Sequence, residues 1–241
     1  MTHISVVIPL YNEEGCLERN FGIIKEHLIS LGKPYEIILV NDGSLDRTGD
    51  IVNMLVRENP CTSSLHNLHN RGKGVAVKKG MLHASGGFIL FLDADLAVPA
   101  QFIGTCLRQL ESGSAVVIGS RHLPESCFKI RQGFARQFLG EIFRRGVKLF
   151  LGLHVTDVTC GLKGFERRAA IEIFSRSRVE RWGYDAEILF LARKLGYQIR
   201  ELPVVWYHSF DSKVRIFSAA VNTLIEVFKI YYCFLTNRYG L

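Results

Sequence analysis

The sequence predicts an α/β fold: a doubly wound, mostly parallel sheet with helices on both faces, followed by amphipathic helices towards the C-terminus. Along residues 1–120, short apolar runs alternate with segments whose apolar side chains recur at helical spacing. The apolar runs are continuous and do not alternate with polar residues, which is typical of strands buried on both faces of a sheet. Turn and cap residues follow most of these runs, so each strand is expected to lead into a helix.

The first strand and helix have recognisable ends. Residues 4–9 form an apolar run that Pro9 is expected to end, because proline cannot donate a hydrogen bond to a neighbouring strand. A helix is predicted over 17–31, where leucine, isoleucine and phenylalanine recur at helical spacing before Gly32.

The later units repeat this pattern. They are a strand over 35–40 with a helix over 48–57, a strand over 64–69 with a helix over 70–84, a strand over 88–92 with a helix over 99–109, and a strand over 115–119. The turn and cap residues from Asn41 to Ser44 separate the second strand from its helix. Asn70-Arg71-Gly72-Lys73-Gly74 opens the third helix with two cations, which favours either a phosphate cradle or a basic helix cap.

Polar side chains follow four of the predicted strands. Tyr11 and Glu13 follow the first, Asp42 the second, Asp93 with Asp95 the fourth, and Arg121 the fifth. Because the carboxyl ends of parallel strands meet at one edge of a sheet, we expect these side chains to converge there.

Asp93 and Asp95 are one residue apart at the end of the 88–92 strand. On an extended segment, side chains at this spacing point the same way, and two carboxylates held together repel unless a cation or protons intervene. Mg²⁺ or Mn²⁺ is often held by one or two carboxylates and the phosphates of a substrate. The pair therefore predicts a metal–diphosphate site, with a solvated Asp-x-Asp turn as the alternative.

The basic residues are concentrated in the second half of the chain. The chain has 241 residues and a formal net charge of +7, and 48% of its residues are hydrophobic, enough for one large or two small domains. Residues 1–120 carry 10 Lys and Arg against 12 Asp and Glu, whereas residues 121–241 carry 20 against 11. This balance favours an anionic partner such as phosphate or acidic lipid. No RNA- or DNA-binding motif accompanies it, so nucleic acid is not expected.

The six cysteines are scattered without Cys-x-x-Cys spacing, as expected for reduced thiols rather than a disulfide framework or a zinc site. Strand-like sequence begins at Ile4, so no signal peptide is expected. No run of about 18 uncharged apolar residues occurs, so no membrane-spanning helix is expected.

The motifs together resemble those of family 2 glycosyltransferases, which have the GT-A fold. Those that carry the resemblance lie at 7–13, 40–44, 70–74 and 93–96, and those typical of the polyprenol-phosphate branch, which includes dolichyl-phosphate mannosyl- and glucosyltransferases, lie at 119–121, 157–163, 182–187 and 206–213. The resemblance covers about residues 4–215. It implies a nucleotide diphosphate sugar as donor and a polyprenyl phosphate as acceptor.

The resemblance also implies roles for single residues. Those implied to bind the donor are Pro9, Tyr11, Glu13, Asp42, Lys73, Asp93, Ala94, Asp95 and Lys213. Those implied in catalysis are Asp93, Asp95, Arg121, Asp185 and Lys213, with Asp95 and Asp93 as the metal ligands. Some mannosyltransferases carry a glutamine near the metal where this chain has Ala97, which weakens the case for a mannose donor.

The resemblance also places residues on the acceptor side. Asp157, Asp185 and Glu187 occupy positions of acceptor-side carboxylates in relatives. A hydroxyl acceptor needs a general base, whereas an ionised phosphate does not, so Asp185 is expected to orient the sugar or bind Arg121. A buried ion pair is the alternative for Asp185. Arg215 could supply a second cation beside Lys213.

Two basic amphipathic stretches follow the predicted sheet. The first, about 128–151, has an apolar, aromatic face flanked by Lys and Arg, which favours either a helix at a membrane interface or a core helix with a basic outer face. The second, 216–235, could pack on the domain, dimerise or rest on lipid. The expected organisation is a catalytic domain over 1–215, with a nucleotide-binding half over 1–120 and an acceptor half over 121–215, and an apolar helix over 216–241.

The sequence therefore predicts an inverting, metal-dependent glycosyltransferase, cytoplasmic and peripheral at the cytosolic face of a membrane. It would move a hexosyl group from a UDP-glucose or GDP-mannose type of donor to a polyprenyl or dolichyl phosphate. The alternatives are a family 2 enzyme that acts on a saccharide or protein hydroxyl, and a non-catalytic nucleotide-sugar-binding or scaffold protein.

Overall fold

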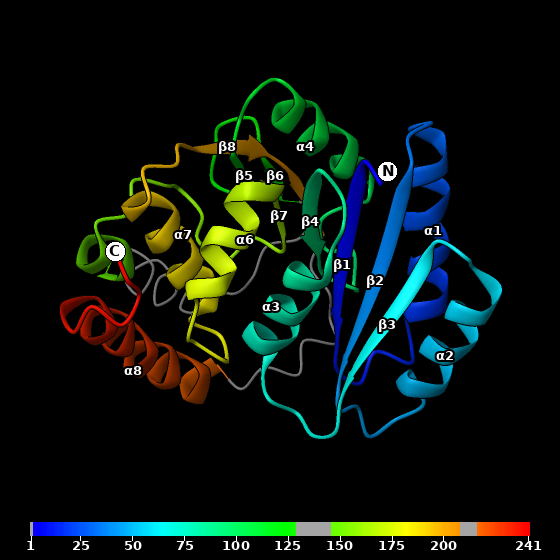
Figure 1. Cartoon of the computed structure of the whole chain (residues 1–241), viewed down its shortest axis with the longest axis horizontal. Helices are drawn as coiled ribbons and strands as arrows, with labels where there is room; N and C mark the ends of the chain where they lie inside the picture. Colours follow the sequence, from blue (N-terminus) through cyan, green and yellow to red (C-terminus); the bar gives the residue numbers. More distant parts are fainter. Residues whose placement is uncertain (1, 129–145, 208–215) are drawn as a thin grey trace.

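The computed structural model describes residues 2–128, 146–207 and 216–241 of the chain. Seven strands form the central sheet in the order β3-β2-β1-β4-β7-β5-β8 (Figure 1). They are β1 (Ile4–Leu10), β2 (Tyr35–Asp42), β3 (Thr62–Asn67), β4 (Phe88–Leu92), β5 (Val116–Ser120), β7 (Leu162–Glu166) and β8 (Ile199–Pro203). Only β7 runs antiparallel to its neighbours, β4 and β5. The predicted mostly parallel, doubly wound sheet is confirmed.

Helices cover both faces of this sheet (Figure 1). The helices are α1 (Leu17–Ser30), α2 (Thr48–Glu58), α3 (Lys73–His83), α4 (Gln101–Glu111), α6 (Arg167–Arg176), α7 (Tyr184–Lys194) and α8 (Ile216–Leu235). Alternate residues of each central strand point to opposite faces, so Val7 of β1 joins the core beneath α3, α6 and α7, whereas Val6 and Ile8 join the core beneath α1, α2 and α4. Burial on both faces explains why these strands are continuous apolar runs.

The sheet reverses its strand order between β1 and β4. From β1 the chain adds β2 and β3 on one side and then crosses to place β4 on the other. β1 pairs with β2 as far as Leu10, but with β4 only as far as Val7. The carboxyl ends of β1 and β4 therefore diverge, and such a switch point is where ligands bind in open α/β sheets.

Several expected boundaries change; β2, for example, continues to Asp42, and β3 begins at Thr62. β1 continues through Pro9 to Leu10, because Pro9 still takes its place opposite Val40. The expected helix over 128–151 does not begin at Phe128: Cys127–Phe128 form the short strand β6, which pairs with β9 (Val205–Trp206). Residues 129–145 lie outside the described residues, and residues 146–151 are helical, with Val147 and Leu151 buried in the core.

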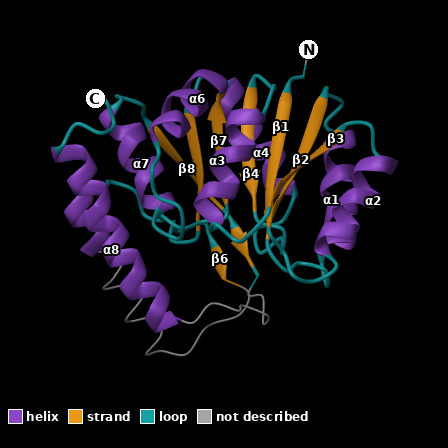
Figure 2. Cartoon of the chain, turned by 60° about the horizontal axis from the view of Figure 1, so that its bottom comes forward, coloured by secondary structure: helices purple, strands orange, loops and turns teal. Residues whose placement is uncertain are grey.

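The C-terminal helix packs on the domain. α8 lies along the outside of α7 (Figure 2), with Val227, Ile230 and Cys233 buried against the core on that side of the sheet. Of the three arrangements expected for it, packing on the domain is the one seen, although its outer face stays exposed. Within the described ranges, no helix has the length and apolar character needed to cross a bilayer.

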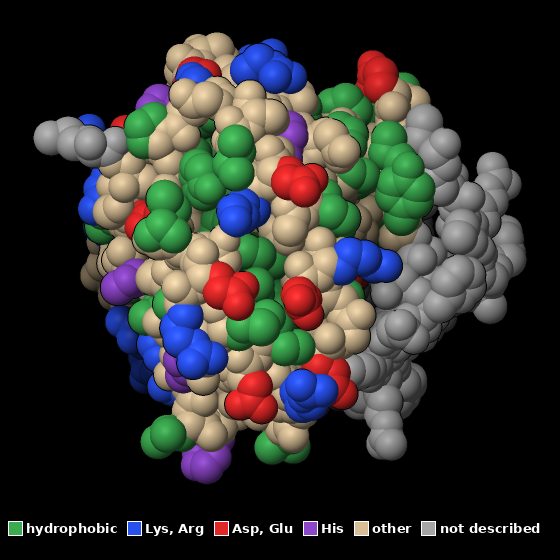
Figure 3. All heavy atoms as spheres, turned by 90° about the vertical axis from the view of Figure 1, so that its right-hand side faces the viewer, with side chains coloured by type: hydrophobic (Ala, Val, Ile, Leu, Met, Phe, Trp, Pro, Cys, Tyr) green, Lys and Arg blue, Asp and Glu red, His purple; other side chains and the backbone are tan. Residues whose placement is uncertain are grey.

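The opposite end of the molecule has a different surface. The face on the side of α1 and α2 carries acidic and basic side chains side by side (Figure 3). Neither sign of charge dominates this face, so it offers no basic stripe of the kind that tracks a nucleic-acid backbone.

Candidate active site

The loops after β1 and β2 are tied together at the carboxyl edge of the sheet. The backbone N–H of Asn12 donates to Ser44 Oγ at 3.0 Å, and the N–H of Leu45 donates to Asn12 Oδ1 at 2.8 Å. The N–H of Glu13 donates to Thr48 Oγ1 at 2.8 Å. These bonds hold the loop that carries Tyr11, whose side chain is 41% exposed beside the switch point.

Pro9 and Glu13 lie on either side of Tyr11. Pro9 is half-buried near the end of β1, and Glu13 precedes α1. The thiol of Cys16 donates to Glu13 Oε2 at 3.3 Å, and burial first, then this bond, raise the pKa of Cys16 to about 12. The thiol is thus protonated at neutral pH, and Glu13 is fixed at the start of the helix.

Asp42 holds the loop at the start of α3. Its Oδ1 accepts from Asn67 Nδ2 at 2.7 Å and from the N–H of Arg71 at 3.1 Å, and its Oδ2 accepts from the N–H of Gly72 at 2.8 Å. The Asp42 side chain itself therefore occupies the backbone donors that were expected to cradle a phosphate. The part of the predicted phosphate cradle that still faces the site is the Lys73 side chain, which pairs with Asp93.

The turn that carries Asp93 and Asp95 follows β4 directly. The N–H of Leu96 donates to Asp93 O at 3.3 Å, and Asp95 Oδ1 accepts from the N–H of Ala97 at 3.0 Å. Leu96 adopts a φ of 50°, which is unfavourable for a residue with a branched apolar side chain. Such strain is retained where the surrounding structure requires it, often at functional sites.

Ala94, between the two aspartates, is buried, and its carbonyl oxygen accepts from Asn20 Nδ2 of α1 at 2.7 Å. A buried contact with the first helix thus fixes the middle of the turn. The two carboxylates on either side of Ala94 are less buried than Ala94 itself, with Asp95 the more exposed.

Negative charge is in excess around this turn. Lys73 Nζ lies 2.6 Å from Asp93 Oδ1. Burial lowers the pKa of Lys73, but the carboxylates of Asp93 and Asp185 outweigh burial and raise it overall. Burial first, and then the charge of Asp93, raise the pKa of Asp95. Lys73 pairs with Asp93 and not with Asp95, so a further cation beside Asp95 would relieve the repulsion between the two carboxylates.

The start of β7 passes immediately behind Asp93. The N–H of Asp93 donates to Gly161 O at 3.2 Å, and a Cβ at position 161 would lie 2.3 Å from Asp93 Oδ2. Only glycine leaves room for the carboxylate here. The position of Asp93 thus depends on the antiparallel strand as well as on β4.

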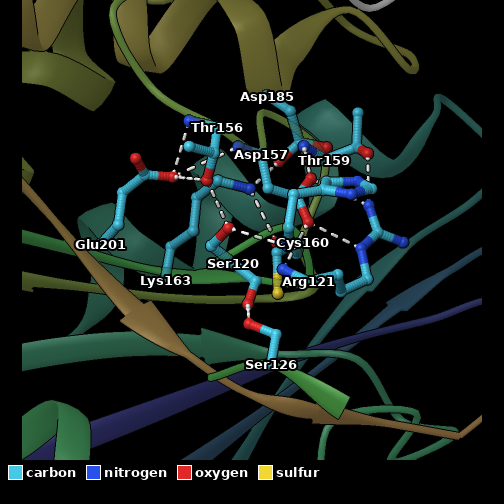
Figure 4. Close-up of polar contacts among 11 residues, drawn as sticks. Ser120, Arg121, Ser126, Thr156, Asp157, Thr159, Cys160, Lys163, Asp185 and Glu201 are labelled. Atoms are coloured by element: carbon cyan, nitrogen blue, oxygen red, sulfur yellow. Dashed lines mark hydrogen bonds and ion pairs between the residues drawn. The ribbon is translucent and has the colours of Figure 1, made fainter. Parts of the chain in front are cut away.

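A second charged group lies after β5, where Arg121 pairs with Asp157 (Figure 4). Arg121 Nε donates to Asp157 Oδ2 at 2.7 Å and Nη2 to Oδ1 at 2.9 Å, a bidentate pair, and Nη2 also donates to Thr159 Oγ1 at 2.8 Å. Although burial opposes it, the guanidinium holds the pKa of the fully buried Asp157 well below its usual range. Trp206 of β9 places its ring centroid 5.6 Å from the Arg121 guanidinium carbon.

Asp157 is itself held by β8. Glu201 Oε1 accepts from the N–H of Thr156 at 2.7 Å, from its hydroxyl at 2.5 Å and from the N–H of Asp157 at 3.2 Å (Figure 4). The hydroxyls of Thr156 and Ser120 are 2.6 Å apart. The guanidinium of Arg121 is thus positioned by side chains from two strands and the loop before β7.

Asp185 does not bind Arg121, contrary to one expectation. It is almost fully buried at the start of α7 and pairs with Lys163 of β7, which also donates to Cys160 O at 2.8 Å. Burial raises the pKa of Asp185, and Lys163 and Lys73 offset part of that rise. Lys163 is fully buried, with its ammonium 5.2 Å from the Phe91 ring centroid.

Glu187 is fully buried in the first turn of α7, and its role as an acceptor-side carboxylate stays a prediction. Its oxygens accept from the N–H groups of Arg178 and Val179, at 2.8 and 2.9 Å, and from the Tyr239 hydroxyl at 2.7 Å. Lys213 and Arg215 lie outside the described residues, and the segment that leads to them starts at Tyr207, whose N–H donates to Ala97 O at 2.9 Å.

The residues that sequence reasoning missed are Lys163 and Glu201. Both side chains come from strands: Lys163 pairs with Asp185 of α7, and Glu201 accepts from the N–H of Asp157. A lysine within the apolar run Leu162–Phe165 is a usable signal, because an unpaired lysine is almost never fully buried. Glu201 offers no such signal, since a glutamate between Arg200, which is exposed, and Leu202, which is buried, is ordinary in a half-buried strand.

Only two carboxylates are available for a metal ion at the turn. Among the described residues, no group of three or more His, Cys, Asp or Glu could hold a metal by itself. Asp93 and Asp95 nevertheless suit a hard divalent cation that takes its remaining ligands from water and a diphosphate. The excess negative charge beside Asp95 is the feature of the structure that fits such an ion.

Residues 5–174 match the family model described as Glycosyl transferase family 2. The chain belongs to glycosyltransferase family 2. This glycosyltransferase is similar in sequence to proteins named dolichyl-phosphate beta-glucosyltransferase. It is 35% identical to one from Trichomonas vaginalis, with 95% of this chain and 72% of that protein covered. It is 33% identical to the one from Dictyostelium discoideum (97% and 75% covered) and 32% identical to the one from Saccharomyces cerevisiae (98% and 76%).

Solved structures show the same fold for this glycosyltransferase. Glucosyl-3-phosphoglycerate synthase from Mycobacterium tuberculosis, crystallised with Mn²⁺, UDP and glucosyl-3-phosphoglycerate, aligns with a TM-score of 0.70 at 18% identity, covering 100% of this chain and 81% of that chain. A mannosyltransferase from Pyrobaculum calidifontis, in complex with GDP-Man and Mn²⁺, aligns with a TM-score of 0.59 at 22% identity, covering 88% and 58%. The expected GT-A fold is confirmed.

Proposed function

We propose that this glycosyltransferase transfers a glucosyl group, with inversion, from UDP-glucose to the phosphate of dolichol or a similar polyprenol. The observation that carries the proposal is the pair of charged groups at one sheet edge. One group is acidic, around Asp93 and Asp95, and the other presents Arg121. The names of the relatives support glucose and dolichyl phosphate, and Ala97 supports glucose over mannose.

The donor would bind at the switch point between β1 and β4. Tyr11 would pack against the base, Glu13 and Asp42 would border the nucleotide pocket, and Lys73 would pair with the diphosphate. Asp95, with Asp93, would hold Mg²⁺ or Mn²⁺. When bound, such an ion neutralises charge that develops on the leaving nucleoside diphosphate. Neighbouring folds crystallised with Mn²⁺ or Mg²⁺ support this assignment.

The acceptor phosphate would bind at Arg121. A guanidinium has five N–H donors, and Asp157 and Thr159 accept from those on Nε and Nη2. Among the described residues, Nη1 has no hydrogen-bond acceptor, so its two N–H groups are available to a substrate. An acceptor phosphate oxygen would form a bond to the anomeric carbon while the bond from that carbon to the diphosphate oxygen breaks. The phosphate is already ionised, so its attack needs no general base.

A lipid acceptor requires the site to meet a membrane, and we place the membrane contact on α8. Its outer face carries exposed apolar side chains, as does the helical segment 146–151 beside it. These side chains are Leu149, Phe150, Ile225, Phe228, Tyr231, Tyr232 and Leu235. Phe150 packs against Phe228 and Tyr231 with centroids 5.4 and 5.0 Å apart, so the patch is continuous. Lys229 and Arg238 beside it suit anionic headgroups.

The cytosolic face of the membrane is the proposed side. The structure describes the side chains of five of the six cysteines, and all five are free thiols, two of them at least partly exposed. Free accessible thiols suit a reducing compartment.

The proposal is tested by a transfer assay with radiolabelled UDP-glucose, GDP-mannose and UDP-N-acetylglucosamine against dolichyl phosphate, undecaprenyl phosphate and dolichol. We expect label from UDP-glucose to enter a polyprenyl phosphate, to be lost in EDTA and to return with Mg²⁺ or Mn²⁺. Asp95→Asn should abolish the transfer, and Asp50→Asn, an exposed change on α2, should not. Full activity in chelator would refute the metal role, and label in dolichol alone would refute the acceptor.

A second candidate is transfer to a saccharide or protein hydroxyl. It is favoured by one observation, the raised pKa of Asp185, because a carboxylate of raised pKa is a better general base. The pairing of Asp185 with Lys163 works against this candidate, since the ammonium stabilises the ionised form and occupies one of its oxygens.

A further inference from the structure

A short loop before α7 covers the start of α3, and we call residues 178–183 the Trp182 loop. The N–H of Val75 donates to Glu180 O at 3.1 Å. Gly72 adopts a φ of 108°, and a Cβ there would lie 2.5 Å from Glu180 O. The two segments are therefore in direct backbone contact, and the start of α3 cannot move without the loop.

The loop also contacts the Lys73 side chain. The Lys73 ammonium lies 5.9 Å from the centroid of the Trp182 ring and 2.6 Å from Asp93 Oδ1. A cation over the face of an indole ring is stabilised by the ring quadrupole. The ring and the carboxylate together define where this ammonium points, so a displaced loop would release it from one of its two partners.

Glu226 of α8 holds the far side of the loop. Its Oε1 accepts from the N–H of Arg181 at 3.2 Å, and its Oε2 accepts from the N–H of Gly183 at 2.7 Å. Gly183 is the N-cap of α7, where a carboxylate is stabilised by the helix dipole. A Cβ at position 183 would lie 2.8 Å from Glu226 Cβ, so the close approach requires glycine.

The C-terminal segment holds the beginning of the loop as well. Arg178 donates its backbone N–H to Glu187, which also accepts from Tyr239, and its guanidinium donates to Arg238 O at 2.9 and 2.6 Å. Both ends of the Trp182 loop are thus fixed by residues from the C-terminal part of the chain. Of these contacts, those of Glu226 lie next to Trp182 itself.

We propose that Glu226 is a positioning residue for the donor site: it holds the Trp182 loop over Lys73 and so directs this ammonium towards Asp93 and the donor diphosphate. The proposal rests on the proposed function for the role of Lys73. It also places a residue needed for donor binding on the same helix whose outer face is proposed to meet the lipid.

Steady-state kinetics of three variants test this role. Glu226→Gln keeps the size of the side chain but loses its charge and one acceptor oxygen, and Gly183→Ala disturbs the same contact from the other side. We expect each to raise the KM for the nucleotide sugar roughly tenfold, with kcat within about twofold of wild type. Glu58→Gln is the matched control, because it makes the same change at an exposed side chain at the end of α2, and it should leave both constants unchanged.

Trp182 fluorescence gives a readout that does not depend on sugar transfer. In a Trp206→Phe background Trp182 is the only tryptophan. Adding Glu226→Gln should increase acrylamide quenching of Trp182 and weaken UDP binding by calorimetry, with far-UV circular dichroism unchanged. Wild-type donor KM and quenching in both Glu226→Gln and Gly183→Ala would overturn the proposal, as would a loss of kcat with KM unchanged. A wild-type protein that binds UDP but glucosylates no polyprenyl phosphate would refute the proposed function and leave this test standing.

Discussion

Asp157 is the residue on which the guanidinium of Arg121 depends. It is fully buried and accepts hydrogen bonds from the side chain of Arg121, from the N–H of Arg121 and from the N–H of Thr159. A buried charge that loses its partner is strongly destabilising, whereas the pair itself contributes little beyond specificity. The pair is therefore best understood as a means of orienting Arg121 rather than as a source of stability.

Replacing Asp157 with Asn should lower the free energy of unfolding by about 3 kcal/mol at pH 7. Because the pKa of Asp157 is lower in the folded than in the unfolded state, its contribution is fully present above its ordinary pKa and declines as pH falls through the acid range. The difference between wild type and variant should be constant from about pH 5 to 8 and shrink below about pH 4. Urea denaturation across this range, with Asp50→Asn as control, measures it. A difference that grows on acidification would contradict the ion pair.

At the scale of elements, the antiparallel strand β7 completes the site that parallel strands begin. Gly161, immediately before β7, lies behind Asp93, and Lys163 of β7 pairs with Asp185. The proposed donor side and the proposed acceptor side thus depend on one strand. A change at the start of β7 is expected to affect Asp93 although it removes no charged group.

Gly161→Ala should displace the Asp93 carboxylate, since the new Cβ would lie 2.3 Å from its Oδ2. We expect at least about a tenfold loss in affinity for UDP with Mg²⁺, measured by calorimetry, because Asp93 would lose both its pairing with Lys73 and its proposed position at the metal. Gly87→Ala, where the added Cβ makes only an ordinary contact of 3.6 Å with His3 O, is the control. Equal affinities of the two variants would show that Asp93 does not depend on Gly161.

The sequence predicts those parts of the site that depend on neighbours along the chain. Asp93 and Asp95 follow an apolar strand, and parallel order brings Asp42 and Arg121 to the same edge. The sequence does not predict which carboxylate pairs with which cation. Three buried carboxylates, the fully buried Lys163 and the partly buried Arg121 lie among the described residues between 121 and 187. Which pairs form depends on strand register and side-chain direction. Asp157 rather than Asp185 meets Arg121 because β7 runs antiparallel and takes Lys163 to Asp185.

At the scale of the whole molecule, the two ends differ in surface chemistry. The end beside α1 and α2 is mixed in charge (Figure 3), whereas α8 presents a continuous apolar patch flanked by basic residues. Phe228 is 63% and Leu235 66% exposed, which is unusual for side chains of this size in one patch. This asymmetry supports the membrane contact proposed for α8.

Phe228→Ser with Leu235→Ser should reduce co-sedimentation with anionic phosphatidylserine liposomes by at least about tenfold, because each apolar side chain contributes about 1.5–3 kcal/mol when fully buried. Ile29→Ser with Leu68→Ser removes similar side chains, 56% and 94% exposed, from other parts of the surface and should have no effect. Equal partitioning of the two double variants, or a concentration-dependent dimer of wild type that the first variant abolishes, would assign the patch to another partner.

The central claim is that the acceptor is a phosphate, and the rates of Asp185→Asn and Arg121→Ala with dolichyl phosphate test it most directly. A hydroxyl nucleophile relies on a general base for about 10²–10⁴-fold in rate, whereas an ionised phosphate does not. We predict that Asp185→Asn keeps a measurable rate and that its rate depends on pH as that of the wild type does. Arg121→Ala should raise the acceptor KM and lose more activity than Asp185→Asn. An Asp185→Asn enzyme that is inactive at every pH yet binds both substrates normally, beside a nearly normal Arg121→Ala, would contradict the claim.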